Sequence, residues 1–174
     1  MNIHCKHFFH FFTLSRSFLS ILLFVCAFPL AAGQGPELHP FVSGSLQQIV
    51  ESHNGRPFIL VMWSPECSSC RKELDMLTSL CREHPKLDVI LVATDEEPDP
   101  ESISRILREE DLSELESWYF AGPNSRKMRY EIDSSWYGEI PRTYLYGPDH
   151  ERIAVSGLLK SEQLKDWISS AIPD

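Results

Sequence analysis

Basic residues are scarce in this sequence. Its 174 residues include 16 Lys and Arg against 25 Asp and Glu, which gives a formal net charge of −9 at pH 7. An acidic surface repels polyanions, so we expect neither nucleic acid nor an anionic lipid surface as a partner. The chain also lacks internal repeats and low-complexity tracts. Its length suits one domain with a proper hydrophobic core.

The chain has no apolar run that clearly matches a membrane span. The apolar stretch 18–30 follows Lys6 and Arg16 and is closed by Ala32 and Gly33, whereas a spanning helix needs about 20 apolar residues. A basic start, an apolar centre and small residues at the end are typical of a secretory signal. We therefore predict a signal peptide over 1–33, cleaved after Ala32 or Gly33, with an N-terminal membrane anchor as the alternative. Export, for example to the periplasm, would place the chain where disulfides persist.

Two cysteines follow an apolar, strand-like run at 58–63. Cys67 and Cys70 have the C-x-x-C spacing, and the apolar period after them predicts a helix over 67–84. In this context C-x-x-C indicates a redox pair. Cys67 would lie at the helix N-terminus, where free N–H groups and the helix dipole favour a thiolate. Cys70, one turn later, is close enough to close a disulfide with it. The pattern therefore predicts an attacking thiol at Cys67 and a resolving thiol at Cys70.

Other uses of these cysteines stay open. With Cys81 and His84 the pair spells C-x2-C-x10-C-x2-H, a zinc pattern. Residues 71–83 contain neither Gly nor Pro, so a continuous helix would hold Cys81 some ~16 Å from Cys70, and we expect no metal site. A purely structural disulfide is a second alternative. A third is Cu(I) binding by Cys67 and Cys70, although the chain has no tract rich in Met and His to support copper handling. Cys81 itself is predicted to be a small buried hydrophobe.

The remaining pattern alternates helices and strands. We interpret 34–44 as a loose leader and 45–174 as the folded domain. Alternation followed by a terminal hairpin predicts an α/β fold, with a mixed sheet and helices on both faces. The expected helices are 45–51, 101–110, 125–132 and 161–172, and the expected strands after 58–63 are 87–93, 115–120, 143–146 and 152–155.

With these residues in hand, the chain resembles thioredoxin-fold proteins of the exported TlpA/ResA-like group. The resemblance covers about 45–172 and is carried by the stretch from Trp63 to Glu73, by Ile140 and Pro141, and by 157–167. It implies a thioredoxin-like fold in which Pro141 is a cis-proline facing the two thiols. It also implies that Ile140 and Pro141 bind an extended substrate through the backbone of Ile140.

The resemblance also assigns a role to Glu73. It matches a glutamate beside the active site of ResA-like proteins, and a carboxylate one turn after Cys70 could accept the proton that Cys70 must lose. The alternative is a solvated helix residue paired with Lys72 or Arg71. The candidate catalytic residues are thus Cys67, Cys70 and Glu73.

Two positions depart from the family pattern. Glu66 stands before the first cysteine, where its charge would disfavour the thiolate, and Arg142 follows the proline, where it would favour the thiolate if it points inward. The segment 134–139 is longer than usual, and its two aromatic residues either rim the substrate groove or cover the core.

Together these features predict an exported thiol:disulfide oxidoreductase that reduces disulfides of client proteins and needs no cofactor. The resemblance implies a membrane-embedded electron donor that reduces the cysteine pair again. It further implies apocytochrome or copper-site cysteines as clients. A copper-handling thioredoxin-fold protein is the alternative function.

Overall fold

The computed structural model describes residues 35–172. The predicted signal peptide or membrane anchor at 1–33 lies outside these residues. Within 35–172, no helix is both long enough and apolar enough to cross a membrane.

A six-stranded mixed sheet forms the centre of the described domain. Its strand order is β1-β4-β3-β2-β5-β6, in which the first four strands are parallel and the last two run antiparallel to their neighbours. This confirms the predicted mixed sheet and its terminal hairpin. The strands are β1 (Leu38–Phe41), β2 (Phe58–Trp63), β3 (Asp88–Ala93), β4 (Glu116–Phe120), β5 (Arg142–Tyr146) and β6 (Arg152–Ser156).

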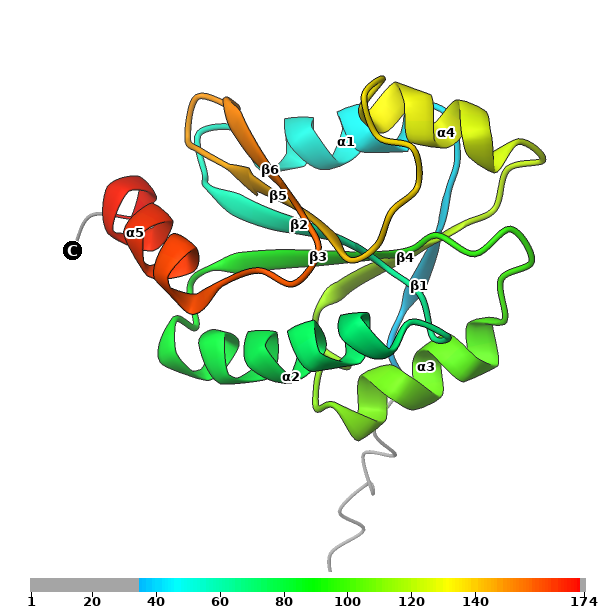
Figure 1. The fold of residues 1–174 in the computed structure, drawn as a ribbon, viewed down its shortest axis with the longest axis horizontal. Helices are drawn as coiled ribbons and strands as arrows, with labels where there is room; N and C mark the ends of the chain where they lie inside the picture. The colour runs from blue at the N-terminus through cyan, green and yellow to red at the C-terminus, as the bar shows by residue number, and fades with distance from the viewer. Residues whose placement is uncertain (1–34, 173–174) are drawn as a thin grey trace, which may run out of the picture. The chain divides into compact units, whose positions relative to one another are not determined.

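Helices cover both faces of the sheet (Figure 1). Two of them, α1 and α4, pack on one face, and α2, α3 and α5 pack on the other. Each predicted helix is present to within two residues at either end. The helices are α1 (Ser45–Ser52), α2 (Ser68–Glu83), α3 (Pro100–Glu109), α4 (Ser125–Ile132) and α5 (Ser161–Ala171).

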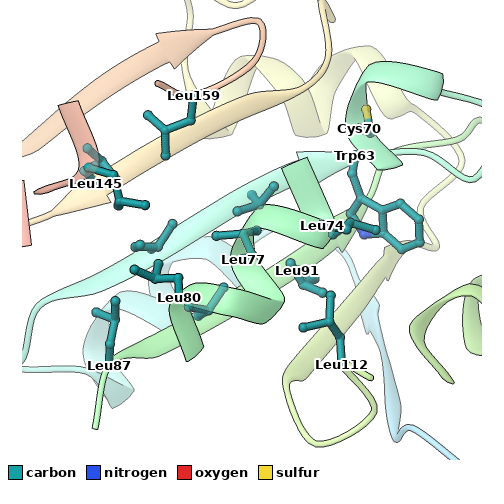
Figure 2. Close-up of a cluster of buried hydrophobic side chains, with 14 of the residues drawn as sticks. Trp63, Cys70, Leu74, Leu77, Leu80, Leu87, Leu91, Leu112, Leu145 and Leu159 are labelled. Atoms are coloured by element: carbon teal, nitrogen blue, oxygen red, sulfur yellow. The ribbon is translucent and has the colours of Figure 1, made fainter. Parts of the chain in front are cut away.

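The strand that leads into the cysteine pair is the most buried element. All six residues of β2 are buried, because both faces of this central strand are covered by helices. On the α2 face, Trp63 packs with Leu74, Leu77 and Leu91 in one apolar cluster (Figure 2). Each fully buried side chain of this size contributes roughly 1.5–3 kcal/mol through removal of apolar surface from water. The helix that carries the cysteines is thus fixed against the sheet along its length.

The interpretation of 34–44 as a loose leader is wrong at 38–41. These residues form β1, which pairs in parallel with β4 from Leu38 opposite Ser117 to Phe41 opposite Phe120. The strand is short and contains Pro40, which a sheet tolerates at its edge because no ladder donor is needed on the open side. The buried ring of Phe41 lies 5.4 Å from that of Phe120, centroid to centroid. The folded domain therefore begins before residue 45.

Candidate active site

The two cysteines of the C-x-x-C pair form a disulfide at the start of α2. The sulfur atoms of Cys67 and Cys70 are bonded, and their Cα atoms lie 5.2 Å apart. Cys67 is the N-cap residue and is partly exposed, whereas Cys70 is fully buried. Of the two cysteines, only Cys67 therefore has surface that a large reaction partner can reach.

Hydrogen-bond donors surround the sulfur of Cys67. Its Sγ accepts the backbone N–H of Cys70 at 3.1 Å and lies 3.3 Å from the Oγ of Ser69. The first contact follows from the helix start, where backbone N–H groups have no partner within the helix, and the second is made by the side-chain hydroxyl of Ser69. In the reduced protein these donors would stabilise a thiolate on Cys67.

A polar pair supports the turn between β2 and α2. The hydroxyl of Ser64 donates to Oδ1 of Asp95 at 2.6 Å and accepts the backbone N–H of Glu66 at 3.1 Å. The backbone N–H of Thr94 donates to the carbonyl of Trp63 at 2.9 Å. Sequence reasoning missed Ser64 and Asp95 as supporting residues. The available signal was a polar residue just after each strand, Ser64 directly after β2 and Asp95 two residues after β3, since β3 and β2 are parallel neighbours and end at the same edge of the sheet.

Glu73 is fully buried, so its interpretation as a solvated helix residue is wrong. One carboxylate oxygen accepts the hydroxyl of Thr143 on β5, and the other accepts the backbone N–H of Leu159 at 3.0 Å. Burial raises the pKa of Glu73 and outweighs these two hydrogen bonds, which lower it. Glu73 lies one turn after Cys70 and faces the same buried side of α2. A buried carboxyl of raised pKa one turn after Cys70 supports the proposed proton-accepting role of Glu73.

Pro141 lies at the same end of the sheet as the disulfide. The peptide bond between Ile140 and Pro141 is cis, as predicted. Met62 pairs with Arg142 across β2 and β5, so Pro141 stands beside Trp63, where β2 ends and the turn to Cys67 begins. The carbonyl of Pro141 accepts the N–H of Gly157. Neither the N–H nor the C=O of Ile140 has a hydrogen-bond partner among residues 35–172.

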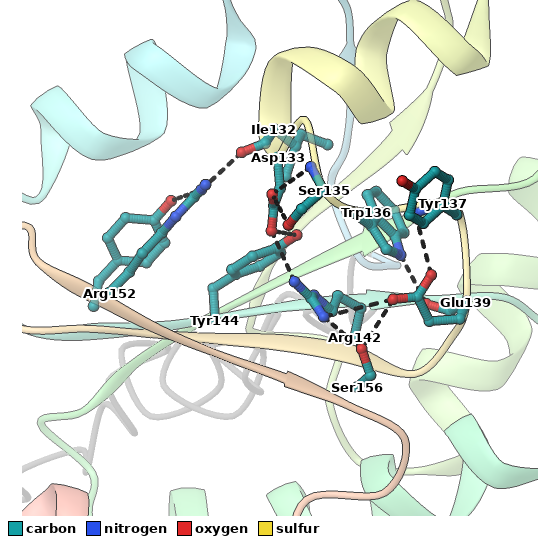
Figure 3. A network of polar contacts seen from close by, with 11 residues as sticks. Ile132, Asp133, Ser135, Trp136, Tyr137, Glu139, Arg142, Tyr144, Arg152 and Ser156 are labelled. Atoms are coloured by element: carbon teal, nitrogen blue, oxygen red, sulfur yellow. Dashed lines mark hydrogen bonds and ion pairs between the residues drawn. The ribbon is translucent and has the colours of Figure 1, made fainter.

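Arg142 does not point toward the thiols. Side chains alternate along β5, and because Thr143 faces Glu73 on α2, Arg142 faces the opposite side of the sheet. There its Nη2 donates to Oδ2 of Asp133 at 2.7 Å (Figure 3). The condition under which Arg142 would favour the Cys67 thiolate is therefore not met.

The zinc arrangement does not form. Helix α2 is continuous from Ser68 to Glu83, so it separates Cys81 and His84 from the cysteine pair by several turns. Within the described part of the chain, no three His, Cys, Asp or Glu side chains are placed to hold a metal ion. Cys81 is half-buried against the apolar cluster that contains Leu74 and Leu77, and burial raises the pKa of its thiol.

No protein-family model matches the chain, and no curated protein sequence matches it. Solved structures do match, at low sequence identity. A secreted disulfide oxidoreductase of Mycobacterium tuberculosis, described as homologous to Escherichia coli DsbE, is 17% identical over 69% of this chain and 85% of its own, with a TM-score of 0.56. The thioredoxin domain of a thiol-disulfide oxidoreductase from Bacteroides vulgatus is 18% identical over 70% and 82%, also with a TM-score of 0.56.

A thioredoxin-related protein from Neisseria meningitidis serogroup B is 22% identical over 72% of this chain and 91% of its own, with a TM-score of 0.59. At identities this low, the structural matches establish the fold alone. The chemistry of this chain has to be inferred from its own residues. The match agrees with the resemblance seen in the sequence. The chain therefore has the thioredoxin fold, with its C-x-x-C disulfide at the start of α2.

Proposed function

We propose that the chain is an exported thiol:disulfide oxidoreductase that reduces disulfides in client proteins. The observation that carries this proposal is the disulfide between the N-cap of α2 and its first turn, with Cys67 partly exposed and Cys70 buried. An accessible sulfur among hydrogen-bond donors can attack a partner, and a buried sulfur beside it can react only with its neighbour.

The first step is thiol–disulfide exchange at Cys67. In the reduced protein, the thiolate of Cys67 attacks one sulfur of the client disulfide. A bond forms between Cys67 and the client while the client's own S–S bond breaks. The departing client sulfur carries the electron pair and takes up a proton.

The second step releases the client. Cys70 loses its proton, and its thiolate attacks the Sγ of Cys67, so the Cys67–Cys70 bond forms and the mixed disulfide breaks. The second client sulfur departs with the electron pair and takes up a proton, so two electrons have passed to the client, which leaves with two thiols. We assign the proton of Cys70 to Glu73. This carboxyl is buried one turn away, and its raised pKa makes it a better base than an exposed glutamate.

Client binding is assigned to the backbone before the proline. The N–H and C=O of Ile140 have no partner in the described chain and lie at the sheet end that carries the disulfide. An extended client segment could pair with them, in the manner of an added strand. Pro141 would hold this edge in place beside β2.

The cycle requires a source of electrons, because each client reduced leaves the pair as a disulfide. The resemblance to TlpA/ResA-like proteins favours a membrane-embedded donor, and apocytochrome or copper-site cysteines as clients. The predicted signal at 1–33 supports an exported, periplasmic location.

The proposal is tested by reacting the reduced protein with a disulfide-bonded test protein such as insulin. The wild-type chain should reduce it, Cys67→Ser should not, and Cys70→Ser should accumulate a mixed disulfide at residue 67. Cys81→Ala, which keeps the pair intact, is the matched cysteine control and should retain the activity. A wild-type protein that binds Cu(I) stoichiometrically and reduces no disulfide would contradict the proposal and support copper handling.

A further inference from the structure

The segment 134–139 joins the end of α4 to Ile140 and is fixed at both ends. At its first end, Oδ1 of Asp133 accepts the backbone N–H and the hydroxyl of Ser135, at 2.9 and 2.6 Å. The other oxygen of Asp133 accepts Nη2 of Arg142 at 2.7 Å (Figure 3). Because Arg142 belongs to β5, this ion pair ties the start of the segment to the sheet.

The second end is held by Glu139. Its carboxylate accepts the hydroxyl of Ser156 on β6 at 2.9 Å and the backbone N–H of Tyr137 at 3.2 Å. Nη1 of Arg142 lies 3.6 Å from the same carboxylate. Arg142 therefore contacts the carboxylates at both ends, between which it lies in Figure 3. Segment 134–139 is thus a braced loop whose shape is set before any partner binds.

The two aromatic residues of the loop have different environments. Trp136 is 4% exposed and belongs to the apolar cluster on the α1 and α4 face, and its indole N–H donates to the carbonyl of Glu139 at 2.8 Å. Tyr137 is 92% exposed. Trp136 therefore covers the core, and Tyr137 alone remains available at the surface.

Exposure alone does not distinguish Tyr137, because single exposed aromatic residues are common on protein surfaces. Tyr130 on α4 is 68% exposed in the same chain. The difference is position. Tyr137 stands three residues before Ile140, so their Cα atoms are at most about 10 Å apart along the chain. An aromatic ring on a braced loop at this distance provides contact area without a large ordering cost on binding.

We propose that Tyr137 is a client-contacting residue that selects disulfides flanked by apolar side chains. This inference rests on the proposed function, since it places the client segment along Ile140. A client strand advances about 3.3 Å per residue, so the Cα distance between Tyr137 and Ile140 corresponds to about three residues of client strand. The partner chemistry it fits is an extended polypeptide with a large apolar residue within about three positions of the reacting cysteine.

The test compares two peptide disulfides that differ only in their flanking residues. One carries Leu or Phe within three positions of the cysteine, and the other carries Gly there. The measured quantity is the second-order rate constant for reduction by the pre-reduced protein, divided by the rate constant for oxidised glutathione. For the wild type this ratio should be larger for the apolar peptide.

Tyr137→Ala should lower the ratio for the apolar peptide by at least about fivefold, as expected for an aromatic contact residue at a binding site. It should change the ratio for the Gly peptide much less. Tyr137→Phe should keep most of the preference, because the ring supplies the apolar contact. Tyr130→Ala is the matched control, because it removes an exposed tyrosine ring that lies on α4 and not on the loop. It should leave both ratios unchanged.

Two results would overturn the inference. Equal ratios for Tyr137→Ala and the wild type would show that the ring does not contact the client. An equal loss in Tyr130→Ala would show that removal of any exposed tyrosine has the effect. If the wild type reduces neither peptide nor oxidised glutathione, the proposed function itself is refuted, and this inference with it.

Discussion

Glu73→Gln should make stability less sensitive to pH. Burial raises the pKa of Glu73 in the folded protein, so the folded state holds its proton to a higher pH than the unfolded chain does. At a pH below the ordinary pKa of a glutamate, Glu73 is protonated in both the folded and the unfolded state, and no charge is buried. As the pH rises toward the folded-state pKa, the unfolded chain loses its proton first, and the wild type loses stability.

The magnitude follows from linkage. Each unit by which the pKa is raised corresponds to about 1.4 kcal/mol of lost stability at a pH above both values. Glutamine keeps an oxygen that can accept the N–H of Leu159, and the hydroxyl of Thr143 can turn to accept from the new amide. At pH 4 to 5 the two proteins should therefore unfold with free energies within about 1 kcal/mol of each other.

The assay is urea unfolding of the oxidised protein at several values from pH 4 to pH 8. The stability of Glu73→Gln relative to the wild type should rise steadily with pH. Asp75→Asn, on the exposed side of α2, measures how much of any change comes from removing one negative charge from an acidic chain. A stability difference between Glu73→Gln and the wild type that is constant from pH 4 to pH 8 would refute the burial argument for Glu73.

Three further outcomes are expected. If Glu73 accepts the proton of Cys70, Glu73→Gln should slow client release from the mixed disulfide, but it should leave the rate of mixed-disulfide formation unchanged in the Cys70→Ser background, where that proton is absent; stopped-flow measurement of the mixed disulfide checks both. Reduced Cys81 should be alkylated more slowly than reduced Cys67 at pH 8, because burial raises the pKa of its thiol, and faster alkylation of Cys81 would contradict its placement. Cys81→Ala should lower the free energy of unfolding in urea by about 1 kcal/mol. Arg142→Met should cost about 3–5 kcal/mol, because it leaves the carboxylate of Asp133 partly buried without its cation; a loss under 1 kcal/mol in urea unfolding at pH 7 would show that the loop does not depend on the ion pair.

The sequence was sufficient for the elements whose signal is local. The apolar run of β2, the C-x-x-C spacing and the helical period after Cys70 all lie within about 25 residues, and the structure has each of them. The predicted redox pair needed nothing beyond this local order. The cis bond before Pro141 was also expected, from the resemblance.

The parts that sequence reasoning missed depend on residues far apart in the chain. Strand β1 is only four residues long and contains a proline, so its identity comes from pairing with β4, about 80 residues later. The burial of Glu73 depends on Thr143 and Leu159, and the support of the active-site turn depends on Asp95. No local pattern specifies such contacts, because they exist only after the sheet has brought these elements together.

The orientation of Arg142 shows the same limit. Its position after Pro141 was visible in the sequence, but the face of β5 to which it belongs was settled by the contact between Thr143 and Glu73. Once that face is known, the partner of Arg142 is the carboxylate at the end of α4, and the bracing of 134–139 follows.

The most direct test of the central claim is the redox equilibrium of Cys67 and Cys70 with glutathione. The oxidised and reduced fractions are measured by mass spectrometry after acid quenching and alkylation, across a range of glutathione ratios. For a client-reducing dithiol we expect a reduction potential close to the roughly −270 mV of thioredoxin. A potential near the roughly −120 mV of the strongest oxidants of this fold, or a pair that does not exchange with glutathione at all, would contradict the account.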